Sequence, residues 1–324
     1  MTAQSTDFLI DARNITVSYP KDKGRQVILN DINLRVKPGE FVTVVGSSGC
    51  GKSTMLSLIL GSQKPTDGIV YVAGKRVERV NRDRGIVYQT YTLYRHLTVL
   101  QNIALGIMLE KVSLLGRLAV SPFLLAELLL GRFAPRRAFM LLPYFKVREE
   151  ALGIARQLLS DIGLTPADGD KYPRELSGGM RQRVAIAQSV AMRPEILLMD
   201  EPFGALDSNR RKEMQDFIHD QWKKFGLTIF FVTHDLEEAV KLGTRLICLS
   251  QYWSGPNGEP AVGAKVVVDR AVMGGDVLPT AFARQKEFQD LVDTIGRMGL
   301  SKQILPMADF DLSHENAVHK EENV

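Results

Sequence analysis

The sequence predicts an α/β protein with a buried parallel sheet at its centre. Phe41–Val45 is a short, apolar run rich in β-branched residues, as buried parallel strands are. A glycine-rich turn follows it, and Met55–Leu60 then has the apolar content of a packed helix. Three later runs have the same strand character and are expected in the same sheet: Ile196–Met199, Leu227–Val232 and Arg245–Leu249.

The other elements are expected on either side of this core. Residues 7–37 alternate between apolar and polar residues, which is typical of an antiparallel meander. Residues 149–194 are expected to form a helical subdomain, and residues 208–225 a surface helix with one apolar face. After residue 250 the pattern predicts a strand over Ala264–Asp269 and a helix over Pro279–Arg297.

The turn after the first strand fits a phosphate-binding loop at every constrained position. A glycine, four residues, a glycine, a lysine and a serine follow one another from residue 46 to residue 53. Strand, turn and helix together aim backbone N–H groups and a helix N-terminus at phosphate, and a chance glycine-rich turn would lack these flanks. Lys52 is expected to reach the β- and γ-phosphates of a nucleoside triphosphate, and Ser53 to hold Mg²⁺. The expected nucleotide contacts are Gly46, Ser47, Ser48, Gly49, Cys50, Gly51, Lys52, Ser53 and Thr54.

Two carboxylates follow the strand at residues 196–199. Asp200 is expected to hold Mg²⁺ through water, and Glu201 to polarise the attacking water, as a positioned carboxylate can. A pair of solvated acids at a strand end is the simpler interpretation in isolation. The phosphate loop before the pair and Pro202–Asp207 after it favour the catalytic one.

A third segment, Leu176-Ser177-Gly178-Gly179-Met180-Arg181-Gln182-Arg183, defines the kind of nucleotide-binding protein. With the other two motifs in this order, the chain resembles the nucleotide-binding subunit of ATP-binding cassette (ABC) transporters over roughly residues 7–106 and 149–250. The resemblance implies a P-loop NTPase cassette over residues 7–250. It would have an antiparallel β subdomain, a RecA-like core and an α-helical signature subdomain, and would hydrolyse ATP to drive transport.

The resemblance also implies roles for individual residues. Tyr19 would stack on adenine, although an aromatic residue near a strand end is often simply core. Gln89 would touch the metal and the attacking water, and His234 would contact the γ-phosphate, although a histidine after a strand is more often structural. The remaining positions that match the family are Ser177, Gly178 and Gly179 of the signature, and Asp207 in the loop after the carboxylates.

The signature is expected to act on a second subunit. A serine and two glycines at a helix N-terminus form an anion cradle. In the family this cradle faces the γ-phosphate held by the other ATPase subunit, identical or different. Two subunits then close head to tail over two ATP molecules, and closure drives the membrane partner.

Composition places the chain among soluble globular proteins. It has 324 residues, of which 45% are hydrophobic and 24% charged, and a net charge of +4 that is too mild to indicate nucleic acid. Cys50 and Cys248 lie far apart and are expected to be reduced thiols. We find neither a signal peptide nor a spanning helix in the pattern. The expected location is therefore peripheral, on the cytoplasmic face of the inner (plasma) membrane, beside a separate permease.

Residues 107–148 form an insertion that is atypical of the family. From residue 111 to residue 148 there are seven Lys and Arg residues and a single acid, Glu127. Ser121-Pro122 and Gly131 are start and stop signals for a leucine-rich helix near residues 122–130. Three interpretations stay open: an extra helical pair packed on its own subdomain, a docking element for the membrane partner, or a lipid contact.

The C-terminus is the second departure from a plain cassette. Residues 251–306 predict a small extension, too short for a large regulatory domain. Residues 307–324 are polar and mostly acidic, and we expect them to be disordered.

Details within the motifs favour an importer. Asp83-Arg84-Gly85 and Asp200–Asp207 are similar to the ATPase subunits of nitrate, sulfonate and taurine importers. This resemblance implies permease subunits, a second ATPase subunit and, for an importer, a substrate-binding protein as partners, ATP and Mg²⁺ as cofactors, and no nucleic acid. The alternatives are a lipid or efflux ATPase and a soluble ABC ATPase outside transport.

Overall fold

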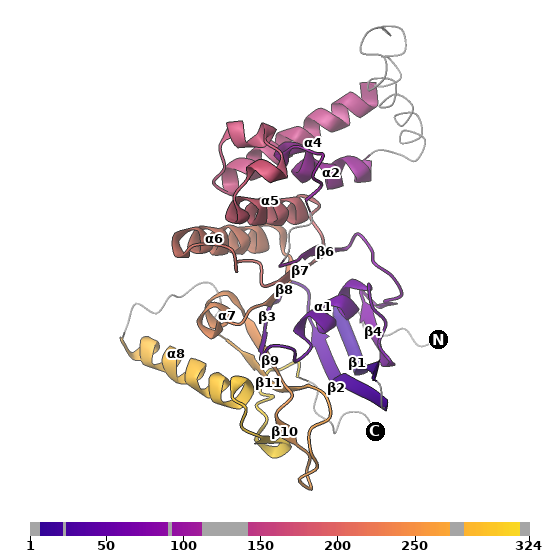
Figure 1. The fold of residues 1–324 in the computed structure, drawn as a ribbon, viewed down its shortest axis with the longest axis vertical. Coiled ribbons are helices and arrows are strands. Elements are labelled where there is room, and N and C mark those ends of the chain that lie inside the picture. Colours follow the sequence, from indigo (N-terminus) through magenta and orange to yellow (C-terminus); the bar gives the residue numbers. More distant parts are fainter. Residues whose placement is uncertain (1–6, 22–23, 90–92, 112–141, 273–281, 318–324) are drawn as a thin grey trace. The chain divides into compact units, whose positions relative to one another are not determined.

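The computed structural model describes residues 7–21, 24–89, 93–111, 142–272 and 282–317 (Figure 1). The chain divides into two units. The core unit comprises residues 1–89, 194–204 and 218–324, and the helical unit comprises residues 90–193 and 205–217.

A six-stranded sheet forms the centre of the core unit, in the order β11-β9-β3-β8-β7-β6. Its strands are β3 (Phe41–Gly46), β6 (Arg84–Val87), β7 (Ile196–Asp200), β8 (Thr228–Val232), β9 (Arg245–Ser250) and β11 (Lys265–Ala271). The first five run parallel, and β11 runs antiparallel to β9. Every residue of β3, β8 and β9 is buried, which is why these strands have continuous apolar sequences rather than alternating ones.

An antiparallel sheet completes the core unit, in the order β2-β1-β4-β5. Its strands are β1 (Ile10–Lys21), β2 (Gly24–Val36), β4 (Asp67–Val72) and β5 (Lys75–Arg76), and the β1–β2 pair confirms the alternating pattern read from the sequence. Helix α1 (Lys52–Leu60) shares one apolar cluster with both sheets. Leu29 of β2, Leu56 of α1 and Leu198 of β7 all belong to that cluster, so the two sheets and the helix bury one common core.

The helical unit packs three helices together. These are α2 (Val99–Lys111), α4 (Leu142–Asp161) and α5 (Gly178–Ala191), with 3₁₀ turns at Pro166–Asp170 and Pro173–Glu175. Helix α6 (Ser208–Phe225) begins in this unit and continues into the core unit from Ile218. The described parts of the insertion belong to α2 and α4, and the helix expected near residues 122–130 lies outside the described residues. Within the described ranges, no helix is long and apolar enough to cross a membrane.

The C-terminal extension is built into the core unit. Its elements are β10 (Trp253–Ser254), β11, α8 (Phe282–Ile295), a π-helical turn (Gly296–Leu300), β12 (Leu305–Pro306) and a 3₁₀ turn (Met307–Asp309). The strand and helix expected after residue 250 correspond to β11 and α8. Helix α8 packs beside α7 (Leu236–Leu242), and the backbone of Ala264 pairs with Ile28 and Asn30 of β2. The extension therefore contacts both sheets of the core unit.

The disorder expected for residues 307–324 is wrong for residues 307–317. Asp311 lies along β11 as a parallel bridge: its N–H donates to Val267 O at 3.0 Å, and its carbonyl accepts from Asp269 N–H at 2.7 Å. Side chains of this segment also pair with bases elsewhere, Asp311 with Arg270 and Glu315 with Lys37. Composition predicted disorder because it counts these acids as solvated. Residues 318–324 lie outside the described residues.

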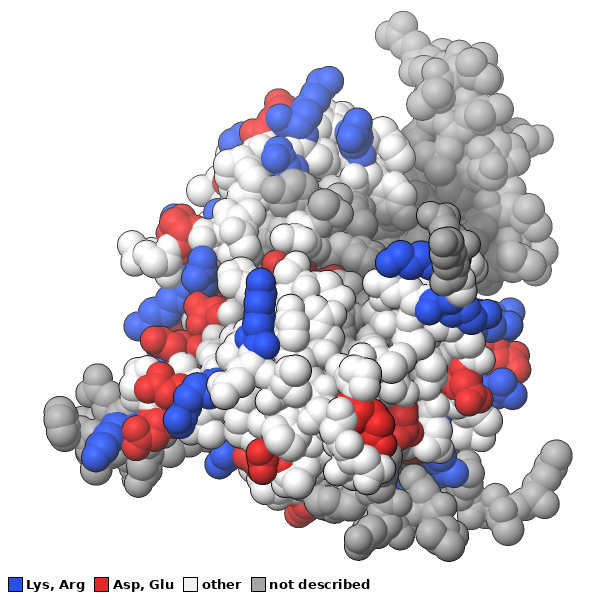
Figure 2. All heavy atoms as spheres, turned by 60° about the horizontal axis from the view of Figure 1, so that its bottom comes forward, with Lys and Arg blue, Asp and Glu red and all other residues white. Residues whose placement is uncertain are grey.

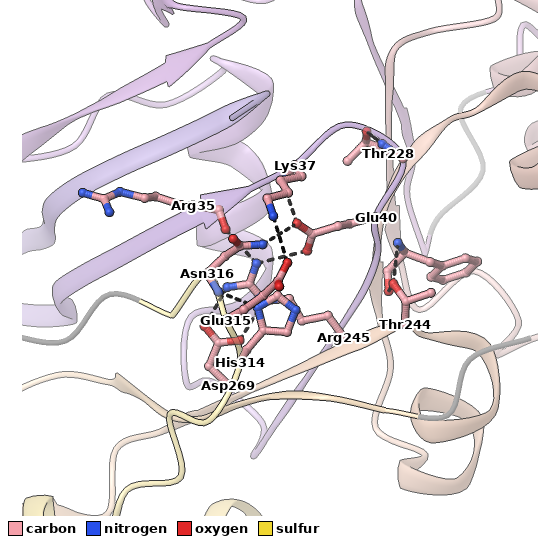
Figure 3. A network of polar contacts seen from close by, with 12 residues as sticks. Arg35, Lys37, Glu40, Thr228, Thr244, Arg245, Asp269, His314, Glu315 and Asn316 are labelled. Atoms are coloured by element: carbon pink, nitrogen blue, oxygen red, sulfur yellow. Dashed lines mark hydrogen bonds and ion pairs between the residues drawn. The ribbon is translucent and has the colours of Figure 1, made fainter. Parts of the chain in front are cut away.

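A buried arginine joins these segments (Figure 3). The Arg245 side chain is fully buried, and its Nε and Nη2 each donate to the Asp269 carboxylate at 2.7 Å. Its Nη1 donates to Arg35 O at 2.7 Å and to Glu40 Oε2 at 3.1 Å. The other oxygen of Glu40 accepts from Asn316 Nδ2 at 3.3 Å. One guanidinium thus holds β9, β11, the end of β2 and the entry to β3, and Glu40 adds the C-terminal segment.

We expect Arg245→Met to lower the free energy of unfolding of the core unit by about 3–5 kcal/mol, because it leaves the carboxylates of Asp269 and Glu40 without their buried partner. Denaturant unfolding followed by tryptophan fluorescence measures this, since Trp222 and Trp253 both belong to the core unit. The control is Lys241→Met, which breaks the exposed pair with Glu237 in the same unit and should cost under about 1 kcal/mol. Equal small losses in both variants would contradict the role assigned to Arg245.

We expect His314 to make the core unit less stable in mild acid. Its Nδ1 accepts a hydrogen bond from Asn316 N–H at 3.1 Å. Burial, and then the positive charge of Arg245, lower the pKa of His314 from its ordinary value of 6.5, against weaker opposing effects of Asp269, Glu40 and Glu315.

Because the folded chain resists this protonation, the stabilisation is complete above the ordinary value and is lost as the pH falls through the lowered pKa. Unfolding free energies at about pH 7.5 and about pH 5.5 should therefore differ less in His314→Asn than in the natural chain. An unchanged difference would show that other groups cause the pH dependence.

Candidate active site

The phosphate-binding loop connects β3 to α1. Gly51 is the N-cap residue of α1 and has φ +99°, a left-handed conformation that favours glycine. A Cβ atom at this position would lie 2.6 Å from Leu29 Cδ2 of β2. The packing of β2 against the loop, and not the ligand alone, therefore requires glycine here.

The loop presents the features of an anion site. Lys52 is largely buried, and its Nζ donates to the carbonyls of Gly46 at 2.8 Å and Ser47 at 3.1 Å, so the ammonium is held inside the loop. The buried Ser47 Oγ has no hydrogen-bond partner among the described residues. The first N–H groups of α1 have no partner within the helix and carry its positive dipole end. These groups fit the phosphates of a nucleoside triphosphate.

The side chain of Cys50, in the phosphate-binding loop, is not a reactive thiol. Cys50 and Cys248 are buried free thiols, and burial raises the pKa of both. A thiol held protonated is a poor nucleophile. The structure therefore agrees with the reduced thiols expected from the sequence.

Three sequence-predicted residues meet at the carboxyl ends of parallel strands. Glu201 directly follows β7, Gln89 follows β6 and His234 follows β8. Gln89 Nε2 donates to Glu201 Oε2 at 3.3 Å, and His234 Nδ1 lies 3.7 Å from the same oxygen. One carboxylate oxygen thus has an amide and an imidazole beside it, an arrangement able to orient a water molecule.

The backbone of Glu201 is held in an uncommon conformation. Its φ is +47°, in the left-handed region, and its N–H donates to Val232 O at 3.0 Å. A non-glycine residue there costs free energy that the surrounding structure must offset. The bond to β8 fixes this turn, so the position of the carboxylate is set by the sheet.

The residues suit a Mg²⁺ ion that is bound together with nucleotide. No three His, Cys, Asp or Glu side chains converge to hold a metal within the described ranges. Mg²⁺ bound with a nucleotide uses one or two protein oxygens, water and the phosphates. The half-buried Asp200 at the end of β7 and Ser53 at the start of α1 offer such oxygens.

The signature belongs to the helical unit. Ser177 caps α5, and its Oγ accepts from Met180 N–H at 3.2 Å. Gly179 lies close to the loop before α6: a Cβ there would be 3.1 Å from Leu206 Cδ2. Asp207 accepts the N–H of Arg210 at 3.0 Å and so caps the start of α6, a local role that the motif alone did not reveal.

Tyr19 lies near the end of β1 with 44% of its surface exposed. Its hydroxyl accepts a hydrogen bond from Gln63 Nε2 at 2.8 Å. The exposed ring of Tyr19 suits stacking on a base.

Sequence reasoning missed a buried pair beside His234. Thr233 Oγ1 donates to Glu238 Oε2 at 2.6 Å, and both residues are buried. The available signal was a glutamate three residues after the Asp235 N-cap, a position where acids are common for other reasons.

We expect Gly51→Ala to weaken nucleotide binding at least about 10-fold, because the added methyl group displaces either the loop or Leu29. The affinity for MgATP measures this. Gly74→Ala is the matched control, since Gly74 also has a positive φ, +71°, but a Cβ there would meet no atom within 4 Å. Similar affinities in the two variants would contradict the steric argument.

Comparison with known proteins agrees with this geometry. The family model for ABC transporters matches residues 29–204. The bicarbonate transport ATP-binding protein CmpD of Synechocystis sp. is 35% identical over 254 residues, covering 78% of this chain and 77% of that protein. The nitrate import ATP-binding protein NrtD of the same organism is 40% identical over 228 residues, covering 70% and 73%.

A solved structure gives the same result. The dimeric post-hydrolysis state of the ATP-binding cassette MJ0796, bound to ADP and Pi, aligns with a TM-score of 0.61 and 28% identity. The alignment covers 82% of this chain and 100% of that one. The chain is therefore an ATP-hydrolysing cassette, and it belongs to the ABC transporter family.

Proposed function

We propose that this chain is the ATPase subunit of an importer for a small oxyanion, coupling ATP-driven closure of an ATPase pair to a separate permease. The observation that carries the proposal is the extent of the likeness to nitrate and bicarbonate import ATPases, which covers 70% or more of both chains. Nitrate and bicarbonate are both small anions with three oxygens. This likeness favours import over a lipid or efflux ATPase and over an ATPase outside transport.

The core unit would carry the chemistry. Tyr19 would stack on adenine while the loop residues, with Lys52, bind the phosphates. Ser53, Asp200 and Gln89 would hold Mg²⁺, which when bound neutralises the developing charge on the phosphates. Glu201 would take a proton from the attacking water, with Gln89 and His234 fixing the position of that water and of the γ-phosphate.

The helical unit would supply the contacts to a second subunit. Ser177, Gly178 and Gly179 offer a helix N-terminus, which suits the γ-phosphate of nucleotide bound by the partner ATPase. Asp207 would lie at the same interface. ATP then favours the closed pair, hydrolysis releases it, and this population shift drives the permease.

The partners follow from this assignment: permease subunits, a second ATPase subunit and, for an importer, a substrate-binding protein. The chain would lie on the cytoplasmic face of the inner membrane. On the face in Figure 2, Lys and Arg are interspersed with Asp and Glu, whereas a nucleic-acid surface gathers basic side chains.

We expect Glu201→Gln to lower ATP turnover at least about 10²-fold, because the amide cannot accept the proton of the attacking water. Affinity for ATP should be retained, so an ATP-bound dimer should accumulate in size-exclusion chromatography with ATP and Mg²⁺. Near-normal turnover, or a monomer under these conditions, would count against Glu201 as the general base.

The transport assignment is tested by purifying the tagged chain from its native membrane in gentle detergent with ATP and Mg²⁺, followed by mass spectrometry. A stoichiometric polytopic permease is expected. Uptake of nitrate and bicarbonate by vesicles containing the purified complex then tests the oxyanion class. Recovery of ribosomal or DNA-repair proteins without a permease would overturn the transport assignment and leave the ATPase chemistry intact.

A further inference from the structure

We propose that Thr233 and Glu238 are positioning residues for ATP hydrolysis, a buried pair that fixes the turn carrying His234 and so holds the imidazole beside Glu201. This inference rests on the proposed function, in which His234 and Glu201 act on the γ-phosphate and the water. In this inference, two residues that would contact neither the γ-phosphate nor the water determine where His234 lies.

His234 needs a device of this kind because its own side chain is 73% exposed. An exposed side chain gains little from packing, so its own contacts do little to restrict its rotamer. The location of its backbone therefore decides whether Nδ1 can stay within reach of the Glu201 carboxylate, now 3.7 Å away.

Thr233 anchors the turn to the central sheet on one side. It follows β8, and its N–H donates to Val44 O of β3 at 3.2 Å. Its hydroxyl accepts the N–H of Asp235 at 3.1 Å, so the hydroxyl bridges the residues before and after His234. Only 3% of Thr233 is exposed, which keeps water from replacing these bonds.

Glu238 anchors the same turn to α7. Its carboxylate accepts the Thr233 hydroxyl at 2.6 Å, within the range of charge-assisted O–H···O⁻ bonds, and only 7% of the residue is exposed. The N–H of Glu238 donates to Asp235 Oδ1 at 3.1 Å, the cap of α7. Side chain and backbone together thereby tie the turn to both β8 and α7.

Thr233→Val tests the pair, because valine keeps the shape and removes the hydroxyl. The readouts are the affinity for MgATP, the kcat of the full chain and the thermal midpoint. We expect kcat to fall about 10-fold or more, the order of loss that a small misplacement causes, with ATP affinity within about twofold. Thr233→Ser restores the hydroxyl and should recover most of kcat.

The matched control is Thr43→Val in the neighbouring strand β3. Thr43 is also fully buried, but its hydroxyl donates to Arg245 O at 3.2 Å. This variant should lose stability as Thr233→Val does and keep its kcat. Equal kcat losses in both valine variants would show that the Thr233–Glu238 pair contributes only to stability, and would overturn the inference.

A double variant shows whether the pair acts through His234. Thr233→Val in a His234→Ala background should cause no further loss of kcat, whereas additive losses would overturn the inference. If Thr233→Val does not fold, Glu238→Gln replaces it, since a neutral amide oxygen accepts the hydroxyl more weakly, and the same pattern is expected.

The remaining outcomes separate the inference from the function on which it rests. A normal kcat in Thr233→Val with a lost kcat in His234→Ala would overturn the positioning role and leave the proposed function standing. A normal kcat in His234→Ala would overturn the role of His234 itself, and the inference with it.

Discussion

The buried charge of Arg245 is the constraint around which the core unit is organised. A guanidinium removed from water is tolerated only when its donors meet well-placed acceptors. Here the acceptors come from three separate segments: Asp269 on β11, Glu40 before β3, and the carbonyl of Arg35 at the end of β2. Because these segments must converge on one group, Arg245 fixes the positions of the extension, the antiparallel sheet and the strand leading to the phosphate loop relative to one another.

The parallel sheet then brings the residues of the candidate site together. Strands β3, β6, β7 and β8 point the same way, so everything that follows their carboxyl ends gathers at one edge of the sheet. Gln89, Glu201 and His234 are far apart in sequence and meet for this reason, and the phosphate loop follows β3 at the same edge. The hydrogen bond from Glu201 N–H to Val232 O shows how directly the sheet sets the site: a neighbouring strand holds the backbone of the proposed general base.

The sequence was sufficient for features that depend on local pattern. A few neighbouring residues were enough to predict three kinds of feature: the apolar strands β3, β7, β8 and β9, the glycine-rich loop, and the N-cap of α5. It failed where a residue's partner lies far along the chain. The acids of residues 309–315 have the composition of a disordered tail. Nothing in the neighbouring sequence indicates that Arg270 forms an ion pair with Asp311, or Lys37 with Glu315. Asp207 was overlooked as a helix cap because its place in a motif already explained it. The Thr233–Glu238 pair was overlooked because an acid in the first turn after an N-cap is common for other reasons.

The antiparallel strand β11 has a consequence for how far this cassette can be shortened. Residues 265–271 supply the hydrogen-bonding partner of β9, and Asp311 in turn covers part of β11. A fragment ending near residue 250, where the family resemblance stops, would expose the fully buried strand β9 as a bare, apolar sheet edge. Such edges template pairing between chains. Solubility, and not only stability, therefore depends on residues that the nucleotide-binding motifs do not include.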